Sequence, residues 1–352
     1  MNILFIDNQQ IKEEHLKYLK EEKPVQIEGN RQYILSLARN VLKKHNVFFP
    51  FQNRKADIAH VFDGFSQPVF FRKELPTVYS LLQPPISKVR VIKQLPVLFS
   101  ETAGFRLFKL WILGLIPQSW FCRYLKRFDK ILTVTNYEKK YLIEHGIPEY
   151  RISKLGVGID YNLFKPMEKE RMGDIFVVSY FGAISAFKGI EIVYKNIKLF
   201  KNRKDIKFKL ALDLYSQRRS NIVKKLRKFK NVEIFGHLTN VKNFLNESDL
   251  VFLPYPTMLG NFSIPFTLLE AMSTGNLVLT TNLPPLKEII EDYKNGFICT
   301  INEMKNKIEW IHENKDSLGY IKRNARKFII ENCDWGRITK KLFSIYNQVV
   351  DS

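Results

Sequence analysis

Residues 249–275 read DLVFLPYPTMLGNFSIPFTLLEAMSTG, and this stretch determines how the chain is expected to fold. The apolar run 250–253 predicts a buried strand, and the pattern after Pro265 predicts a helix that stops at Gly275. A helix that begins beyond the carboxyl end of a strand in an open α/β sheet presents free backbone N–H groups, which favour phosphate. We therefore expect a ligand site at this helix start.

Glu270 lies one to two turns into the predicted helix, close to the same site. A carboxylate there can accept hydrogen bonds from both hydroxyls of a ribose while the helix start faces a diphosphate. This geometry favours a nucleotide over the alternative, a surface glutamate on an ordinary amphipathic helix. The predicted donor contacts at the helix start are Ser263, Ile264, Pro265 and Phe266.

A second predicted phosphate contact lies in residues 180–190, YFGAISAFKGI. Gly182 lets a backbone approach a ligand closely, and Lys188 offers a mobile positive charge to phosphate oxygens. Lys188 and Gly189 open a helical pattern directly after the first strand of the second half. A solvated lysine at a helix start is the alternative, but the position after a strand favours the phosphate contact.

The surrounding pattern predicts an α/β fold of two doubly wound, Rossmann-like domains with a cleft between them. Strand-like apolar runs lie at 3–6, 58–62, 77–82 and 130–134, and again at 176–181, 208–214, 232–235, 250–253 and 277–280. Gly156, Gly158 and Pro166 interrupt the link between the two series, where a hinge is expected. We place an N-terminal domain at 1–160, a C-terminal domain at 161–335 and a last helical segment at 336–352.

The composition is that of a basic globular chain of 352 residues with a formal net charge of +21. This charge implies an anionic partner: a phosphate-bearing substrate, an acidic lipid surface or nucleic acid. Cys122, Cys299 and Cys333 lie far apart without metal-ligand spacing, so we expect a reduced protein with no metal or other cofactor. We expect neither a signal peptide nor a membrane span, because the longest uncharged apolar stretch, 110–122, is too short.

Four segments of the second half, in their order and spacing, resemble the retaining glycosyltransferases of family 4, the group 1 glycosyl transferases. They are GVGIDYNLFKP (156–166), FGAISAFKGIEIVYKNI (181–197), VEIFGHLTNVKNFLNESDLVFLPYP (232–256) and PFTLLEAMSTGNLVLTTNLPPLKEIIEDYKNGFIC (265–299). The end, 333–346, is similar to that family's closing helix, and the first half resembles the family more weakly.

The resemblance implies the GT-B fold and transfer of a sugar from a nucleotide donor with retained anomeric configuration, without a metal ion. It implies that Lys188 contacts the donor phosphates and that Glu270 contacts the ribose. It also implies that the last helix crosses back to the first domain.

The chain departs from the family pattern at three places. The first glutamate of the family's pair, eight positions before Glu270, is here Phe262, and the arginine that partners the phosphate-binding lysine is here Ala183. The family's first-domain histidine aligns near Leu82, beside Gln83. Two interpretations stay open: a divergent enzyme, or a GT-B protein that binds nucleotide sugars or glycans without turnover. The retained phosphate and ribose contacts favour the enzyme.

Candidate acceptor contacts are polar groups near strand ends and at the start of the first domain's helix. Gly29 and Asn30 open that helix, although simple helix capping explains them equally well. His60, Asp63 and Gln83 lie at or just beyond strand ends. A lone histidine at such a position is more often structural, and the sequence assigns no general base.

Two basic regions bear on the partners. Residues 88–127 interleave aromatic side chains with cations, which favours an anionic membrane surface and a lipid-linked acceptor, with a core helix and a solvated basic rim as the alternative. Residues 195–230 are also basic, but no nucleic-acid-reading module accompanies them, so nucleic acid is not expected as a partner. The leading hypothesis is a cytoplasmic glycosyltransferase, peripheral on the membrane, that assembles a lipid-linked or cell-surface glycan.

Overall fold

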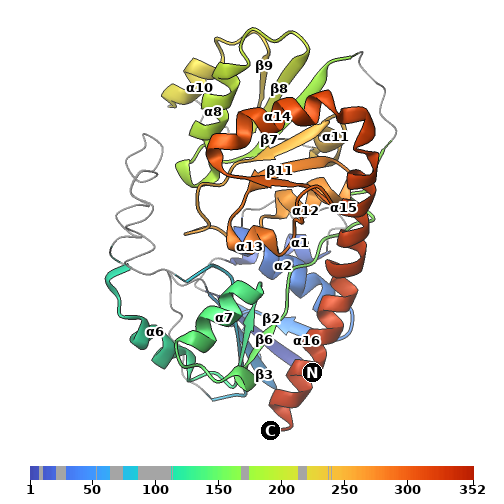
Figure 1. Cartoon of the computed structure of the whole chain (residues 1–352). Helices are drawn as coiled ribbons and strands as arrows, with labels where there is room; N and C mark the ends of the chain where they lie inside the picture. Colours follow the sequence, from blue (N-terminus) through green and yellow to red (C-terminus); the bar gives the residue numbers. More distant parts are fainter. Residues whose placement is uncertain are drawn as a thin grey trace.

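The chain forms two α/β domains, each built around a six-stranded parallel sheet (Figure 1). The computed structural model describes residues 1–7, 11–20, 29–52, 54–63, 74–85, 112, 114–167, 174–212, 220–236, 238 and 240–352. The predicted pair of Rossmann-like domains is confirmed, because the strands of each series pair in parallel within their own sheet.

The first sheet has the strand order β2-β1-β3-β4-β5-β6. Its strands are β1 (Asn2–Asp7), β2 (Asn46–Phe48), β3 (Ile58–Asp63), β4 (Thr77–Leu81), β5 (Lys130–Thr133) and β6 (Ile152–Lys154). Every residue of β4 is buried, as expected for an inner parallel strand covered on both faces. The helices described in this half are α1 (Lys17–Lys20), α2 (Gly29–Val41), α6 (Gln118–Leu125) and α7 (Asn136–Glu144).

The second sheet has the strand order β12-β11-β10-β7-β8-β9. Its strands are β7 (Phe176–Gly182), β8 (Ile206–Leu212), β9 (Val232–Phe235), β10 (Leu250–Leu253), β11 (Leu277–Thr281) and β12 (Phe297–Cys299). The strand order reverses at β7, which pairs with β8 on one side and β10 on the other. The loops after β7 and β10 therefore diverge there, where open α/β sheets bind ligands.

Helices cover the second sheet along the rest of the chain. They are α8 (Ile190–Leu199), α10 (Asn221–Leu226), α11 (Val241–Asn246), α12 (Phe266–Ser273), α13 (Pro284–Lys287), α14 (Met304–Glu313) and α15 (Gly319–Asn332). Short 3-10 turns lie at Glu13–His15, Pro50–Gln52, Glu149–Arg151, Ala186–Lys188, Ile301–Glu303 and Lys315–Ser317. None of the helices in the described part of the chain is long and apolar enough to cross a bilayer.

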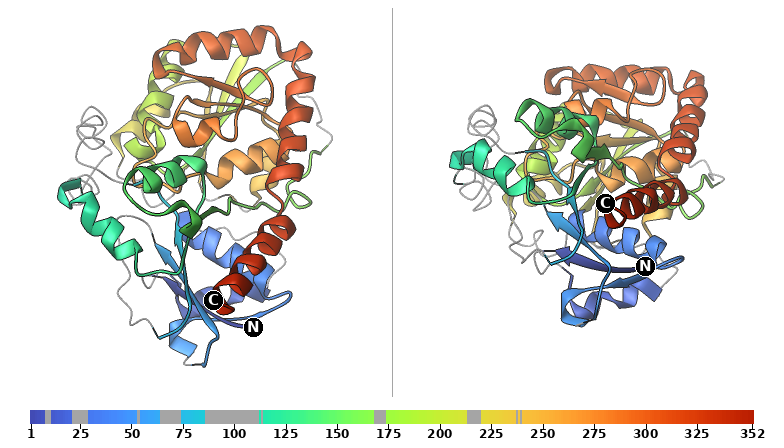
Figure 2. Two further views of the ribbon diagram at one scale, coloured as in Figure 1. Left: turned by 60° about the horizontal axis from the view of Figure 1, so that its bottom comes forward. Right: turned by 90° about the horizontal axis from the view of Figure 1, so that it is seen from below.

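The last helix, α16 (Trp335–Val350), leaves the second domain and runs along the first (Figures 1 and 2). It packs against α2 and β4. The Tyr346 hydroxyl lies 2.5 Å from His60 Nδ1, and Lys341 Nζ donates to the Lys154 carbonyl at 2.5 Å. The C-terminal segment therefore ties the two domains together.

The link between the sheets packs against the start of α16. Gly158 lies so close to Trp335 that an added Cβ would come within 2.3 Å of its ring. Gly156 adopts a positive φ of 90°, and the Ile159 N–H donates to the Cys333 carbonyl at 2.8 Å. The link is thus held against Cys333 and Trp335, at the start of α16. The domain boundary near residue 160 stays a prediction.

Candidate active site

The start of α12 is the centre of the candidate donor site. Pro265 is its N-cap residue, one position earlier than the first-turn position predicted, and the helix ends before Gly275, whose φ is 72°. Strand β10 ends twelve residues before Pro265, at Leu253, so the loop between them leads from the sheet's carboxyl edge to the helix. The predicted succession of strand, loop and helix is confirmed.

Glu270 lies inside the first turns of α12 and is only 5% exposed. Burial raises the pKa of its carboxyl to about 7, and a hydrogen bond from Gln32 partly offsets that rise. Gln32 Nε2, on α2 of the first domain, donates to Glu270 Oε1 at 3.3 Å. The predicted ribose-binding carboxylate is therefore a desolvated group at the contact between the domains.

Tyr255 joins the two predicted donor contacts. It follows β10 directly and is buried, with Lys188 Nζ 5.3 Å from the centre of its ring. Burial raises the pKa of Tyr255, and the charge of Glu270 adds a smaller rise. Lys188 and Glu270 thus both lie near one buried tyrosine that follows β10.

The loop after β7 is held tightly in place. Gly189 has a φ of 81°, and a Cβ there would meet the Pro254 carbonyl oxygen at 1.9 Å. Gly182 ends β7, and the Tyr180 hydroxyl donates to the carbonyls of Ala183 and Lys188 at 3.1 and 3.3 Å. Only glycine fits at position 189, which brings the Lys188 backbone close to the end of β10.

The residues before α12 contact the first domain. The Ser263 N–H and hydroxyl donate to the Leu82 carbonyl at 3.1 and 3.2 Å, and Ser263 and Ile264 are buried. Phe262 stacks on Phe266, with ring centres 5.5 Å apart, and packs 5.3 Å from the ring of Tyr33 on α2. An aromatic cluster therefore fills the position where the family's first glutamate would stand.

The predicted acceptor contacts are not gathered at one point. Gly29 and Asn30 begin α2, and the buried Asn30 Oδ1 has no hydrogen-bond partner among the residues that the structure describes. Gln83 is half-buried just beyond β4. Asp63 ends β3, but its side chain lies outside the described part of the structure.

His60 does not fit a role as acceptor contact. It is fully buried, and both of its ring nitrogens are engaged, Nδ1 with Tyr346 at 2.5 Å and Nε2 with the Ser80 hydroxyl at 2.7 Å. Burial lowers the pKa of His60 to about 3, so the ring stays neutral. The structure corrects this prediction: His60 anchors α16 against the first sheet.

A cavity of about 630 Å³ lies along α2, the link and the start of α16. It meets the candidate donor site only through Gln32 and Phe266, and neither Lys188 nor Glu270 lines it. Within the described residues, no cluster of three or more His, Cys, Asp or Glu side chains could hold a metal ion.

Sequence reasoning did not single out Gln32 or Tyr255. Tyr255 could have been found, because it follows a buried strand at the sheet edge where ligands bind. Gln32 could not, because its role depends on a contact with Glu270, 238 positions away.

Two Rossmann-like domains joined by a crossing helix, with a phosphate- and ribose-suited helix start in the second, define a nucleotide-binding protein of the GT-B class. The family profile described as "Glycosyl transferases group 1" matches residues 164–328, which make up most of the second domain. The chain is accordingly a retaining glycosyltransferase that uses a nucleotide sugar.

Known proteins resemble the chain over most of its length. The capsular polysaccharide biosynthesis glycosyltransferase CapM of Staphylococcus aureus is 25% identical over 308 residues, which are 79% of this chain and 78% of CapM. Two solved structures share the fold. The structure of Anabaena HepE in complex with UDP is 17% identical to this chain, with a TM-score of 0.68. The match covers 99% of this chain and 100% of the HepE chain. Sucrose-phosphate synthase of Thermosynechococcus elongatus is 14% identical to this chain, with a TM-score of 0.72. The match covers 99% of this chain and 98% of the synthase chain.

Proposed function

We propose that the chain transfers a sugar from a UDP-type donor to a lipid-linked or cell-surface glycan at an anionic membrane surface. The observation that carries the proposal is the arrangement of Lys188, Tyr255 and Glu270 around the start of α12. Complexes of HepE with UDP and the capsular role in the name of CapM support the choice of donor and acceptor.

In the proposed donor complex, the diphosphate lies at the start of α12, between Ser263 to Phe266 and Lys188. Gly182 and Gly189 let the loop after β7 approach it. Departure of the diphosphate develops negative charge, which Lys188 and the positive end of the helix stabilise. Glu270, in its ionised form, accepts hydrogen bonds from the ribose hydroxyls. Gly29, Asn30, Asp63 and Gln83 are the remaining candidates for the acceptor side.

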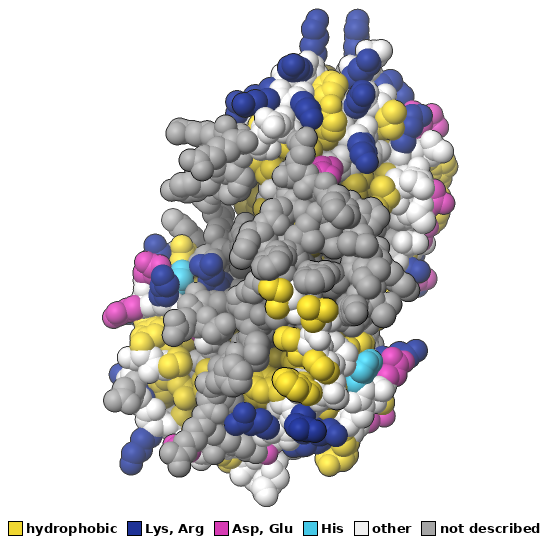
Figure 3. Space-filling model, turned by 90° about the vertical axis from the view of Figure 1, so that its left-hand side faces the viewer, with side chains coloured by type: hydrophobic (Ala, Val, Ile, Leu, Met, Phe, Trp, Pro, Cys, Tyr) yellow, Lys and Arg dark blue, Asp and Glu magenta, His cyan; other side chains and the backbone are white. Residues whose placement is uncertain are grey.

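The proposed membrane contact rests on side chains around α6. Trp120 is 67% exposed and Leu115 48% exposed, and Arg123, Lys126 and Arg127 are exposed close by. Figure 3 views the molecule from the left-hand side of Figure 1 and shows hydrophobic and basic side chains close together in its lower half. More Lys and Arg side chains lie at the upper end, over α8 and α10. Exposed aromatic groups flanked by cations suit an anionic lipid surface. Of residues 88–127, those up to 111 and residue 113 lie outside the described part of the chain.

The donor site is tested by thermal unfolding with UDP-, GDP-, ADP- and CMP-sugars for the native chain and Glu270→Ala. A ligand at about 100 times its Kd adds roughly 2.7 kcal/mol to the free energy of unfolding. We expect UDP-sugars alone to raise the Tm of the native chain, and Glu270→Ala to lose that shift. Glu309→Ala on α14, which removes the ion pair with Lys305 far from the donor site in sequence, is the matched control and keeps the shift. No shift with any donor contradicts the donor assignment.

The membrane contact is tested by sedimentation with vesicles of phosphatidylglycerol or phosphatidylcholine. We expect binding to the anionic vesicles only, and Trp120→Ser to weaken it. Tyr320→Ser is the matched control, because Tyr320 is 44% exposed on α15 of the second domain. Equal loss in both variants contradicts a specific surface around α6.

A further inference from the structure

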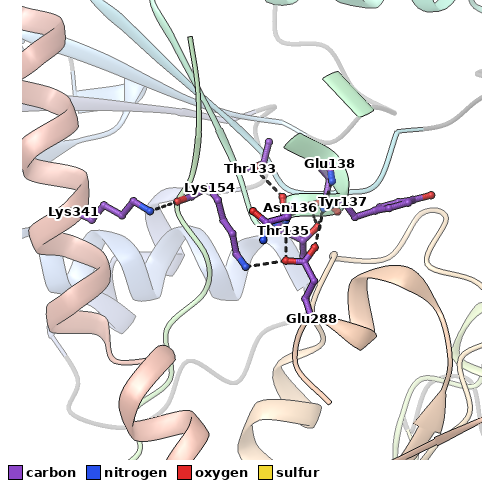
Figure 4. A network of polar contacts seen from close by, with 8 residues as sticks. All are labelled: Thr133, Thr135, Asn136, Tyr137, Glu138, Lys154, Glu288 and Lys341. Atoms are coloured by element: carbon purple, nitrogen blue, oxygen red, sulfur yellow. Dashed lines mark hydrogen bonds and ion pairs between the residues drawn. The ribbon is translucent and has the colours of Figure 1, made fainter. Parts of the chain in front are cut away.

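The first turn of α7 is capped by a carboxylate from the other domain (Figure 4). Glu288 Oε2 accepts the Asn136 N–H at 2.9 Å, and Glu288 Oε1 accepts the Tyr137 N–H at 2.8 Å. Asn136 and Tyr137 begin α7, and the positive end of a helix dipole favours a negative charge there. Two backbone donors of the first domain are thus satisfied by the second domain.

Lys154 of β6 completes this contact. Its Nζ lies 2.8 Å from Glu288 Oε2, and its own carbonyl accepts Lys341 Nζ of α16 (Figure 4). The Glu288 side chain is only 17% exposed and that of Lys154 35%, so the pair is partly withdrawn from solvent. Charge-assisted hydrogen bonds in such surroundings are stronger than those on an open surface.

Glu288 is placed firmly on its own side. It caps the C-terminus of α13, where Pro285 and Leu286 are buried, and the Ile289 N–H returns to the Leu286 carbonyl at 3.0 Å. The other side is equally fixed, because Thr135 and Glu138 form a reciprocal capping box at the start of α7. Two rigid elements therefore meet through one carboxylate.

The same turn of α7 also reaches the candidate donor loop. Glu138 is fully buried, and burial raises the pKa of its carboxyl, while its neighbours Thr135 and Ser263 oppose that rise. Ser263 belongs to the segment that leads into α12. The start of α7 thus lies near the donor loop, while its hydrogen bonds to the second domain are made by Glu288.

We propose that Glu288 is a positioning residue for sugar transfer: by holding the start of α7 and Lys154, it sets the distance between the acceptor-side domain and the donor loop. The inference rests on the proposed function. Reacting groups must lie within about 3–3.5 Å and in line, and a misplacement of about 1 Å costs on the order of a hundredfold in rate. Glu288 touches no substrate in this proposal, so its loss affects turnover more than donor affinity.

The test compares Glu288→Ala, Glu288→Gln and Lys154→Met with the native chain. The readouts are the radius of gyration from small-angle X-ray scattering, with and without UDP, and kcat and KM for turnover of UDP-glucose. Glu288→Ala is expected to increase the radius of gyration and lower kcat at least about tenfold, with KM within about twofold. Glu288→Gln, which keeps an acceptor oxygen, is expected to recover part of the loss, and Lys154→Met to have a smaller effect because the contacts to α7 remain.

Glu291→Ala is the matched control. Glu291 lies three residues further along and pairs with Lys294 at 2.8 Å within its own domain, so both readouts should stay at native values. An unchanged radius of gyration and kcat in Glu288→Ala, or an equal loss in Glu291→Ala, overturns the proposal. If Glu288→Ala fails to fold, the same comparison is decided by Glu288→Gln and Lys154→Met. Absence of turnover in the native chain counts against the proposed function, whereas the scattering comparison still decides the role of Glu288.

Discussion

Replacement of Glu270 by glutamine tests whether this carboxyl is as desolvated as its surroundings indicate. In the native state its pKa is about 7, whereas the ordinary value is 4.5. The difference of about 2.5 corresponds to about 3 kcal/mol, because each pKa unit is worth about 1.4 kcal/mol. Glutamine keeps the shape of the side chain and an oxygen that accepts the bond from Gln32, but it does not titrate.

The direction of the effect follows from proton linkage. Between pH 4.5 and about 7 the unfolded chain has lost this proton while the native chain retains it, so native stability falls as pH rises. Above pH 7 the native state carries the full cost of a buried carboxylate. From pH 4 to pH 8 the free energy of unfolding of Glu270→Gln should therefore rise, relative to that of the native chain, by up to about 3 kcal/mol.

The assay is urea unfolding of both proteins at pH 4, 6 and 8, followed by circular dichroism. All other titrating groups are shared, so their contributions cancel in the difference between the two proteins. A difference that is the same at pH 4 and pH 8 would refute the reasoning, because it would mean that the native carboxyl titrates as it does in the unfolded chain. Glu309→Gln, at a half-buried ion pair on α14, should show no such pH dependence.

Three further outcomes follow from the same structure. UDP binding should release up to about half a proton at pH 7, because ribose hydroxyls favour the ionised form of Glu270; calorimetry in buffers of different ionisation enthalpy measures this. Gly189→Ala should destabilise the native state by at least about 2 kcal/mol in urea unfolding, because of its positive φ and the clash with Pro254. Tyr346→Phe should lower stability by about 1 kcal/mol, by loss of the bond to His60, and leave the affinity for UDP unchanged in calorimetry.

The inner strands of both sheets and the edge strand β9 could be predicted from the sequence, and the other three edge strands could not. An inner parallel strand is covered on both faces, so β4 and β10 are buried throughout and stand out as short, mostly hydrophobic runs. The strands missed, β2, β6 and β12, are three residues long, lie at sheet edges and include polar residues or half-exposed positions. With only three residues each, such segments carry almost no periodic signal.

The candidate site divides in the same way. Lys188 and Glu270 were predicted because each lies in a local succession of strand, loop and helix. Contact partners between the domains lie far away in the sequence. Gln32 donates to Glu270, and Lys154 pairs with Glu288. Contacts between domains leave no local pattern, so only a structure reveals them. The roles of the donor and acceptor contacts stay predictions until ligand binding is measured.

The contacts between the domains also bear on how a donor is bound under the proposed function. The Ser263 N–H and hydroxyl donate to Leu82, and Glu270 accepts from Gln32. These are atoms that the diphosphate and the ribose would use, so donor binding must replace contacts between the domains. Their loss reduces the net free energy of binding. The apparent Kd for the donor equals the intrinsic Kd divided by the fraction of molecules in which these contacts are open. The contact of Glu288 with α7 uses none of these atoms, which allows it to persist while the donor loop is exchanged.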